Sequence, residues 1–455
     1  MTRYGADNWG EEQEVGTPAG QTAARPAQLH GQPVRWRFFF AHFFTVLLGS
    51  MSVAQWAVPV WLLTVAFPVR LVGGWPMHVL LPLCFFLINL GLLHSLRRVP
   101  RLPAHAQVLV RLYCAYGFTA TFCFIFLLLC SGLWGVLWLA CHTVGVMVAT
   151  RGSEITRVQT SLWESLRWVS GIGISTIVGA FVYGYTRGQR QMQITRLTLP
   201  LAGWPQAWHG LKLLHLSDLH IGTNLSAAEF RDYLQRANAL DPDLVFLTGD
   251  LLDSNPAYIP EFFPIFNELK ARYGVFACLG NHDGYAGPQA VADADGLARH
   301  TQVTLLRDQA AQLTIRGFPL HIVGLNDRGK DWARGLDALP LLSQLLATVP
   351  AGEPCVLLSH RPDLFPQAAR AGVALTLAGH THGGQLALPG WQGRFNLARF
   401  ITPFARGLYE YSGRFLYVNR GLGVTGQRVR VFTPREIALL TCVGQAQKCP
   451  PRRLM

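Results

Sequence analysis

The chain has 455 residues, of which 50% are hydrophobic and only 14% are charged. Typical soluble domains carry roughly 25% charged residues, so this composition excludes a disordered protein and an ordinary soluble enzyme. The formal net charge is +13, yet no Asp or Glu occurs from Val15 to Ser153. The basic residues of that region are isolated arginines that flank apolar runs. This pattern indicates a membrane protein, and no nucleic-acid binding is expected.

The N-terminal part of the chain predicts a polar tail followed by membrane helices. Residues 1–34 are rich in Gly, Ala, Gln and Pro, which is typical of a disordered tail. Residues 35–190 form the predicted transmembrane region, with uncharged runs at Phe38–Val69, Leu71–Leu96, Leu112–Thr150 and Trp168–Thr186. Crossing a bilayer takes roughly 20 helical residues. We therefore expect a multi-pass protein of the cell (inner) membrane.

The third run leaves the number of spans open between four and five. Gly132 and Gly135 could mark a turn between two spans, or they could lie within one long helix. The positive-inside rule places the polar tail in the cytoplasm in both cases. With four spans, which we prefer, the C-terminal half also faces the cytoplasm, and with five it faces the other side.

From Leu211 onward the pattern changes to that of an α/β domain, which we place at residues 193–445, followed by a tail at 446–455. Short apolar runs alternate with helical patterns, which predicts strands that alternate with helices. We expect helices near Ala227–Leu240 and Pro260–Lys270. Later strands are expected near Leu313–Ile315, Leu320–Gly324, Cys355–Ser359, Ala374–Ala378, Phe415–Asn419, Val429–Val431 and Ile437–Leu440. Their close spacing implies a large, partly mixed sheet or two sheets.

Polar clusters stand at the ends of five predicted strands. They are Asp218-Leu-His220, Gly249-Asp250-Leu-Leu-Asp253, Gly280-Asn281-His282-Asp283, Ser359-His360 and Gly379-His380-Thr-His382-Gly383. Active sites of α/β sheets lie beyond the carboxyl ends of strands, so we expect these clusters to meet. Carboxylate oxygens together with imidazole nitrogens suit Mn, Fe or Zn. One such residue alone would be an ordinary surface residue, but five clusters in order predict a metal centre.

These five segments resemble the signature of the calcineurin-like metallophosphoesterase superfamily, which reads D-x-H, G-D-x-x-D, G-N-H-D/E, a lone His, and G-H-x-H. The similarity covers about Leu211–Thr441. The strings LSDLHIG, LTGDLLD, GHTHGGQ and YVNRGLG resemble the membrane-associated branch, which often carries N-terminal spans. The resemblance implies a four-layer αββα sandwich with a two-metal centre between its sheets.

The resemblance also implies seven ligands for two divalent metal ions, which would be Mn, Fe or Zn. The first ion would be held by Asp218, His220 and His382, the second by Asn281, His360 and His380, and Asp250 would bridge both. Two such cations neutralise phosphate oxygens and lower the pKa of a bridging water, so that hydroxide is available near neutral pH. No position of the motif set is missing.

Other polar residues are expected to assist catalysis. His282 follows the ligand Asn281 and is expected to face the leaving oxygen as a proton donor. Asp283 is expected to orient His282 or raise its pKa, with a plain helix cap as the alternative. Asp253 is expected to stabilise its turn or to contact the ligand side chains from outside the metal centre, and we do not count it as a ligand.

Three features are candidates for substrate contact. Arg361 follows His360 and could bind a phosphate oxygen, or it could be a surface residue. Arg420 lies at a predicted strand end and could reach the site. The aromatic segment Leu388–Phe415 is either a loop that covers the sheet edge or an apolar lid that admits a lipid tail.

We therefore predict a membrane-anchored hydrolase of phosphoester bonds, a phosphodiesterase or pyrophosphohydrolase in preference to a monoesterase. Its predicted partners are the lipid bilayer and a phosphoester substrate, such as a lipid-linked or nucleotide-activated lipid. The alternative is a membrane scaffold or sensor whose domain binds metal without turning substrate over. The intact His282 and the complete ligand set favour the enzyme.

Overall fold

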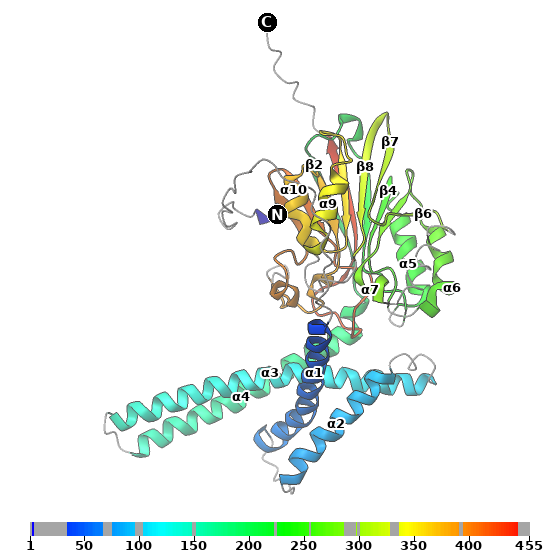
Figure 1. Ribbon diagram of the computed structural model, residues 1–455. Helices are drawn as coiled ribbons and strands as arrows, with labels where there is room; N and C mark the ends of the chain where they lie inside the picture. The colour runs from blue at the N-terminus through cyan, green and yellow to red at the C-terminus, as the bar shows by residue number, and fades with distance from the viewer. Residues whose placement is uncertain are drawn as a thin grey trace, which may run out of the picture. The chain divides into compact units, whose positions relative to one another are not determined.

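A computed structural model describes residues 2–3, 34–66, 75–95, 103–147, 152–222, 225–253, 256–285, 297, 301–327, 336–390 and 395–444. The chain divides into two compact units, Asn8–Val182 and a second unit formed by Tyr183–Met455 with Met1–Asp7. Figure 1 shows the helices of the first unit and the sheets of the second. Most of the predicted tail at 1–34, and all of that at 446–455, lies outside the described residues.

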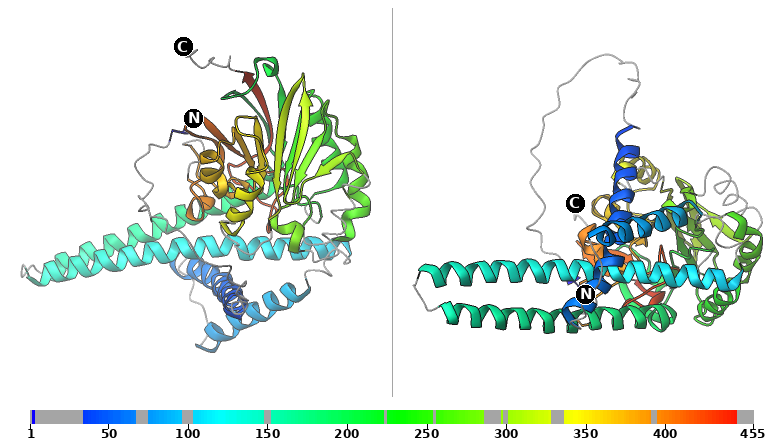
Figure 2. Two further views of the ribbon diagram at one scale, coloured as in Figure 1. Left: turned by 45° about the horizontal axis from the view of Figure 1, so that its top comes forward. Right: turned by 90° about the horizontal axis from the view of Figure 1, so that it is seen from below.

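Four long apolar helices make up most of the N-terminal unit. They are α1 (Val34–Trp61), α2 (Trp75–Ser95), α3 (Ala104–Met147) and α4 (Gly152–Thr186). Within the described ranges, these are the helices long and apolar enough to cross a membrane. Helix α3 continues without a break through Gly132 and Gly135, so the third predicted run is one helix. Helices α3 and α4 lie side by side (Figure 2), with Trp134 against Trp163.

A buried polar cluster joins the first three of these helices. The Asn89 amide on α2 donates hydrogen bonds to Ser52 Oγ and Gln55 Oε1 on α1, each at 2.9 Å. The Tyr113 hydroxyl on α3 donates to Asn89 Oδ1 at 3.0 Å. In an apolar surrounding, hydrogen bonds between helices hold them in one arrangement, because the alternative is an unsatisfied polar group.

Two sheets form the framework of the C-terminal unit. In spatial order the first contains β1 (Thr2–Arg3), β11 (Gly407–Tyr411), β12 (Arg414–Val418), β10 (Leu375–Ala378), β9 (Cys355–Ser359), β8 (Phe318–Leu325) and β7 (Gln309–Ile315). The second contains β2 (Met192–Leu201), β13 (Arg435–Gly444), β3 (Lys212–Leu216), β4 (Leu244–Thr248), β5 (Val275–Cys278) and β6 (Val303–Leu305). Strands β8, β9, β10 and β12 pair in parallel, as do β3, β4, β5 and β6.

The two sheets pack face to face and are covered by helices on their outer faces. Phe246 of β4 and Leu358 of β9 belong to one core between the sheets. The neighbouring residue Val245 points to the other face, where it packs with Phe230 of α5 (Ala227–Asn238). On the far side Leu357 packs with Leu342 of α9 (Leu339–Leu346). This arrangement confirms the predicted four-layer αββα sandwich, in which central strands are apolar on both faces.

The structure departs from the expected elements in three places. The helix expected near Pro260–Lys270 ends early: α6 covers Ile259–Phe262, and a 3-10 turn follows over Phe263–Glu268. Pro264 explains the break, because proline lacks the N–H that a continuing helix needs. The strand expected at Val429–Val431 is reduced to one bridge between Val431 and Leu386. Strands β1, β2, β6 and β11 were not expected.

Candidate metal centre

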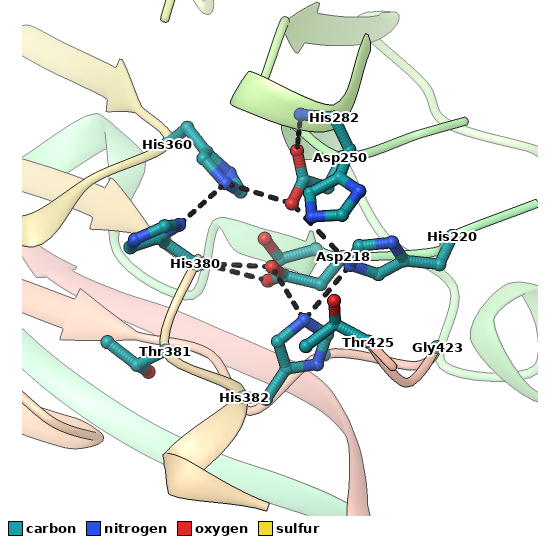
Figure 3. A network of polar contacts seen from close by, with 12 residues as sticks. Asp218, His220, Asp250, His282, His360, His380, Thr381, His382, Gly423 and Thr425 are labelled. Carbon is teal, nitrogen blue, oxygen red and sulfur yellow. Dashed lines mark hydrogen bonds and ion pairs between the residues drawn. The ribbon is translucent and has the colours of Figure 1, made fainter. Parts of the chain in front are cut away.

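The five polar clusters meet at the carboxyl ends of β3, β4, β5, β9 and β10. Strands β3, β4 and β5 belong to the second sheet, and β9 and β10 belong to the first. The centre therefore lies at the carboxyl ends of strands from both sheets. Figure 3 shows the carboxylates and imidazoles directed toward a common point. Six of the seven predicted ligands fall into two groups whose ligand atoms lie within 4.8 Å of one another, namely Asp218, His220 and His382, and Asp250, His360 and His380.

Asp250, a member of the second group, also lies close to the first group. Its Oδ2 is 3.2 Å from His360 Nε2 and 3.5 Å from His220 Nε2. Within the first group, His382 Nε2 is 3.0 Å from His220 Nε2 and 3.4 Å from Asp218 Oδ1. In the second group, His360 Nε2 is 3.3 Å from His380 Nδ1. The geometry therefore places one carboxylate oxygen where two ions could share it.

Asn281 supplies an independent test of whether a cation fits here. Its side chain is buried, and its Oδ1 atom has no hydrogen-bond partner within the part of the chain that the structure describes. Leaving a buried carbonyl oxygen without a partner is costly, and such oxygens in native proteins call for an explanation. Since carbonyl oxygens also coordinate cations, the Asn281 oxygen fits the role of a ligand to a divalent metal ion.

The backbone at the candidate ligands is strained. Five of them have left-handed φ angles that are rare for residues with a Cβ, namely Asp218 (49°), His220 (45°), Asp250 (49°), His380 (67°) and His382 (50°). Each such conformation costs about 1–3 kcal/mol and persists only where the surroundings enforce it. Backbone strain of this kind is often found at functional sites, and here it falls on five of the predicted ligands.

Neighbouring groups hold two of the imidazoles in the orientation that a metal ligand requires. His360 Nδ1 lies 2.8 Å from the Thr248 carbonyl oxygen, to which it donates, leaving Nε2 to face the centre. His380 Nε2 lies 3.3 Å from the Arg361 guanidinium, so Nδ1 faces the centre. Arg361 is buried and pairs with Asp327 at 2.5 Å. Such partners fix the ring orientation of metal-binding histidines. Arg361 is therefore not the surface residue considered as the alternative.

The electrostatics of the centre favour positive charge beside Asp250, whereas burial holds the pKa of His380 and His382 well below the ordinary value. Burial would lower the pKa of His360, but Asp250 and Asp218 raise it to about 10. Burial would raise the pKa of Asp250, but the charge and hydrogen bond of His360, with His220, hold it well below its ordinary value. Burial raises the pKa of Asp218, with opposition from His360. Buried carboxylates that hold a proton on a neighbouring imidazole would equally stabilise metal cations.

In the structure, the carboxylate beside the His282 ring is Asp253 and not Asp283, the residue expected from the sequence. His282 Nδ1 lies 3.5 Å from Asp253 Oδ1. Both oxygens of Asp283 instead accept backbone hydrogen bonds, from Leu252 at 2.8 Å and from Gly280 at 2.7 Å. Burial raises the pKa of Asp283 to about 6. Asp283 thus ties the loop after β4 to the loop after β5, and Asp253 is the carboxylate beside the His282 ring.

The two candidate arginines differ in their surroundings, and the prediction missed a third. Arg420 is buried and donates to Glu436 at 2.9 Å and to Gln193 at 3.0 Å. Arg430, which is fully buried, donates to the carbonyl oxygens of Arg420 and Gly423, and its guanidinium lies 3.4 Å from His382 Nδ1. No local pattern marks Arg430, because its contacts come from distant loops. Asp327 was also missed, although it follows strand β8 as the other clusters follow their strands.

The segment after the last histidine pair divides into two parts. Phe404 and Tyr409 are buried and pack with Phe365 of α10 (Phe365–Arg370), so they belong to the domain core. Phe395 and Phe400 are exposed. The part of Leu388–Phe415 that contains Phe404 and Tyr409 therefore covers the sheet, as the first of the two alternatives expected. The part that contains Phe395 and Phe400 exposes its aromatic side chains.

Comparison with known proteins shows what the C-terminal domain is similar to. Residues 211–384 match the family model for calcineurin-like phosphoesterases. The chain is 35% identical over 243 residues to a metallophosphoesterase of Campylobacter jejuni, covering 53% of this chain and 61% of the relative. It is 29% identical over 275 residues to a transmembrane protein with metallophosphoesterase domain of Danio rerio, covering 56% and 58%.

A third relative is the UDP-2,3-diacylglucosamine pyrophosphatase LpxG of Chlamydia trachomatis. The identity is 28% over 311 residues, which cover 55% of this chain and 89% of that protein. The chain thus matches about three fifths of the length of the Campylobacter and Danio proteins and most of LpxG. Residues 211–384, which carry the strand-end clusters, are therefore similar to calcineurin-like phosphoesterases, and the described N-terminal residues include four helices long and apolar enough to cross a membrane.

Proposed function

We propose that the C-terminal domain hydrolyses a phosphodiester or pyrophosphate bond with two bound divalent metal ions. The observation that carries this proposal is the convergence of two carboxylates and four imidazoles at the carboxyl ends of strands from both sheets. Asn281 directly precedes His282, whose backbone N–H donates to Asp250 Oδ1 at 2.8 Å. The first ion would be held by Asp218, His220 and His382, the second by Asn281, His360 and His380, and Asp250 would be shared. Bound divalent ions supply positive charge against the phosphate oxygens and activate water.

His282 is the proposed proton donor to the leaving oxygen. Its side chain is partly exposed, in contrast to the buried ligands around it, so a substrate can reach it. Asp253 lies beside Nδ1, which leaves Nε2 of the ring for the substrate. Burial would lower the pKa of His282, but Asp253 and Asp250 raise it, which favours the protonated form that an acid catalyst needs. Asp253 acts here as a positioning residue.

Arg361 is the better placed of the two arginines for contact with the substrate. It lines a cavity of about 200 Å³ together with His360, Asn326 and Leu341. The Arg420 guanidinium, which is held by Glu436 and Gln193, is not among the described residues that line this cavity. We therefore propose that Arg361, which also orients His380, contributes positive charge to the wall of the substrate site, and that Arg420 stabilises the loop beneath it.

The proposed substrate is a phosphoester carried by a lipid, with a nucleotide-activated lipid as the first candidate. Two observations support this class. One is the name of the Chlamydia trachomatis relative, which acts on UDP-2,3-diacylglucosamine. The other is the presence of four apolar helices in the same chain, which would keep the site near the bilayer. Manganese is the metal ion that we propose to test first.

An assay of the purified full-length protein tests the enzyme against the scaffold alternative. The protein is loaded with Mn²⁺ and given bis-p-nitrophenyl phosphate, then a UDP-linked diacyl sugar in detergent micelles. We expect hydrolysis that depends on metal and that His282→Ala reduces by about 100- to 10,000-fold, while the metal content measured by mass spectrometry stays unchanged. A wild-type protein that binds two metal ions but hydrolyses neither compound would support a scaffold or sensor.

We also propose that the catalytic domain faces the cytoplasm. The single helix α3 supports four spans over five, which would leave the domain on the same side as the arginine-flanked N-terminal tail. Trypsin can reach Arg272, whose side chain is 60% exposed. In sealed vesicles of defined orientation, we expect cleavage at the domain only when the cytoplasmic face points outward. Cleavage only in the opposite orientation would refute the four-span topology.

A further inference from the structure

Five large apolar side chains are exposed in the loop that follows the last metal-binding motif. They are Leu388, Phe395, Leu397, Phe400 and Ile401, which we call the apolar lip. Phe400 is 89% exposed, more than any other large hydrophobic residue that the structure describes. A single exposed apolar residue needs no explanation, but a cluster of them on one loop marks a surface that meets an apolar partner.

The apolar lip exposes its large apolar side chains and buries a polar one, which is the reverse of the pattern expected for a loop in water. Between its exposed members, the polar Asn396 and the small Ala398 are the buried residues. Asn396 packs under the loop against Gly384, where an added Cβ would come within 2.8 Å of its Oδ1. A loop exposed only to water would place Phe395, Leu397 and Phe400 inward and Asn396 outward. Since the large side chains point outward, the loop is built to contact an apolar phase.

The segment from Arg430 to Phe432 connects the start of the loop to the end of helix α4. The residues at the start of the loop pair with the chain near Val431: Ala387 donates to the Val431 carbonyl at 2.9 Å. The adjacent Arg430 donates its backbone N–H to the carbonyl of Gly184 at 3.4 Å. Phe432 stacks on Tyr183, with ring centroids 5.5 Å apart. The loop is thus anchored to the last turn of an apolar helix that is long enough to span a bilayer.

Charge around the lip suits a membrane surface. The sequence from Leu386 to Tyr409 contains three arginines and no Asp or Glu, and Arg187 and Arg190 follow the end of α4, again without an acid nearby. Apolar side chains flanked by cationic residues are typical of protein surfaces that bind the interface of a bilayer with anionic lipids.

We propose that the apolar lip inserts into the lipid bilayer beside the end of α4, so that the metal centre takes its phosphoester directly from the membrane surface. The first half of this proposal concerns only the lip. The second half rests on the proposed function, because it assumes that the centre hydrolyses a lipid-borne phosphoester. His382 lies only six residues before Leu388, so a lip held in the bilayer interface would keep the centre close to the lipid headgroups.

A photocrosslinking experiment tests the contact with the bilayer without relying on activity. Full-length protein is reconstituted in vesicles of phosphatidylcholine and phosphatidylglycerol, with Phe400→p-benzoylphenylalanine. The matched control is Phe318→p-benzoylphenylalanine, because Phe318 is also exposed, at 44%, but starts β8 at the end of the strand away from the metal centre. Irradiation should produce a lipid adduct at position 400 and only background at position 318.

Other outcomes of this experiment overturn the proposal. Equal lipid adducts at both positions, or none at either, would exclude insertion of the lip. An adduct between two protein chains at position 400 would show that a second copy covers the lip. If the Phe400 variant does not fold, as judged by its melting temperature, the same measurement at Leu397 decides the question.

Kinetics with two substrates test the second half of the proposal, that the metal centre takes its phosphoester from the membrane surface. We expect the double variant Phe400→Ser, Leu397→Ser to raise KM severalfold for a vesicle-borne phosphoester and to leave hydrolysis of bis-p-nitrophenyl phosphate in solution unchanged. An unchanged KM for the vesicle-borne compound would refute delivery through the lip. If the wild type hydrolyses neither compound, the proposed function fails, while the lipid adduct still decides whether the lip enters the bilayer.

Discussion

Replacing Gly379 by alanine tests whether the arrangement of the strand ends controls metal binding. Gly379 precedes His380, and its φ is not in the left-handed region, so alanine is compatible with the backbone. An added Cβ would lie 1.9 Å from Ser217 Oγ and 2.2 Å from Asp218 Oδ2. Since Cβ atoms essentially never approach within 3.0 Å of other atoms, the Asp218 carboxylate would have to move by about 1 Å.

This displacement has a predictable cost. A shift of about 1 Å in a reacting group can lower the rate by about 100-fold, and disturbing the support of a metal ligand costs about 10- to 100-fold in metal affinity. We therefore expect Gly379→Ala to raise the Mn²⁺ concentration for half-maximal hydrolysis of bis-p-nitrophenyl phosphate by about 10- to 100-fold. Overpacking should also lower the unfolding free energy by about 1–3 kcal/mol.

Gly284→Ala is the matched control for this measurement. Gly284 lies three residues after Asn281, and an added Cβ there meets no atom within 4 Å. The same methyl group should therefore leave manganese binding and turnover at wild-type values. If Gly379→Ala binds manganese as tightly as the wild type does, or if Gly284→Ala weakens binding equally, the steric reasoning is refuted.

Three further predictions follow from individual contacts. Asp283→Ala should lower the unfolding free energy by about 2–5 kcal/mol, because two buried N–H groups lose their acceptor, whereas Asp253→Asn should reduce kcat with little change in melting temperature. Burial lowers the pKa of His215 to about 3, so only the unfolded chain takes up this proton below pH 6.5. Stability should therefore fall by about 1.4 kcal/mol per pH unit from this residue as the pH decreases below about 6.5. In His215→Gln, the drop in melting temperature between pH 6.5 and pH 5 should be smaller than in the wild type. Asn89→Leu should destabilise the detergent-solubilised protein by about 1–2 kcal/mol, measured by thermal unfolding, and an unchanged melting temperature would contradict a role for the polar cluster.

The sequence predicted the fold class and the place of the site because both depend on local patterns. Strands β3, β4, β5, β9 and β10 are short apolar runs, and each is followed directly by its polar cluster. The rule that ligands gather at the carboxyl ends of strands is then enough to bring the clusters together. The four-layer sandwich and the four apolar helices agree with those expectations.

Contacts between distant loops could not be predicted in the same way. Asp253 and Asp283 both lie near His282. Which carboxylate lies beside the His282 ring depends on the conformations of the loops after β4 and β5. Arg430 reaches His382 across 48 positions of sequence, from a stretch without any regular pattern. The break of the helix at Pro264, in contrast, could have been predicted, because proline inside an expected helix is a visible signal.

The pairing of β2 with β13 has a consequence for the synthesis of the chain. Strand β2 begins just after the end of α4, lies at the edge of its sheet and pairs along its whole length with β13, the last strand that the structure describes. A growing chain therefore exposes the unpaired edge of β2 next to the membrane until Arg435–Gly444 has left the ribosome. Strand β13 also separates β2 from β3, so a chain that stops before Arg435 leaves two strand edges open to pairing with other chains. Nascent chains held at one membrane and stalled before this strand would meet each other's open edges, and aggregation at the bilayer would compete with folding.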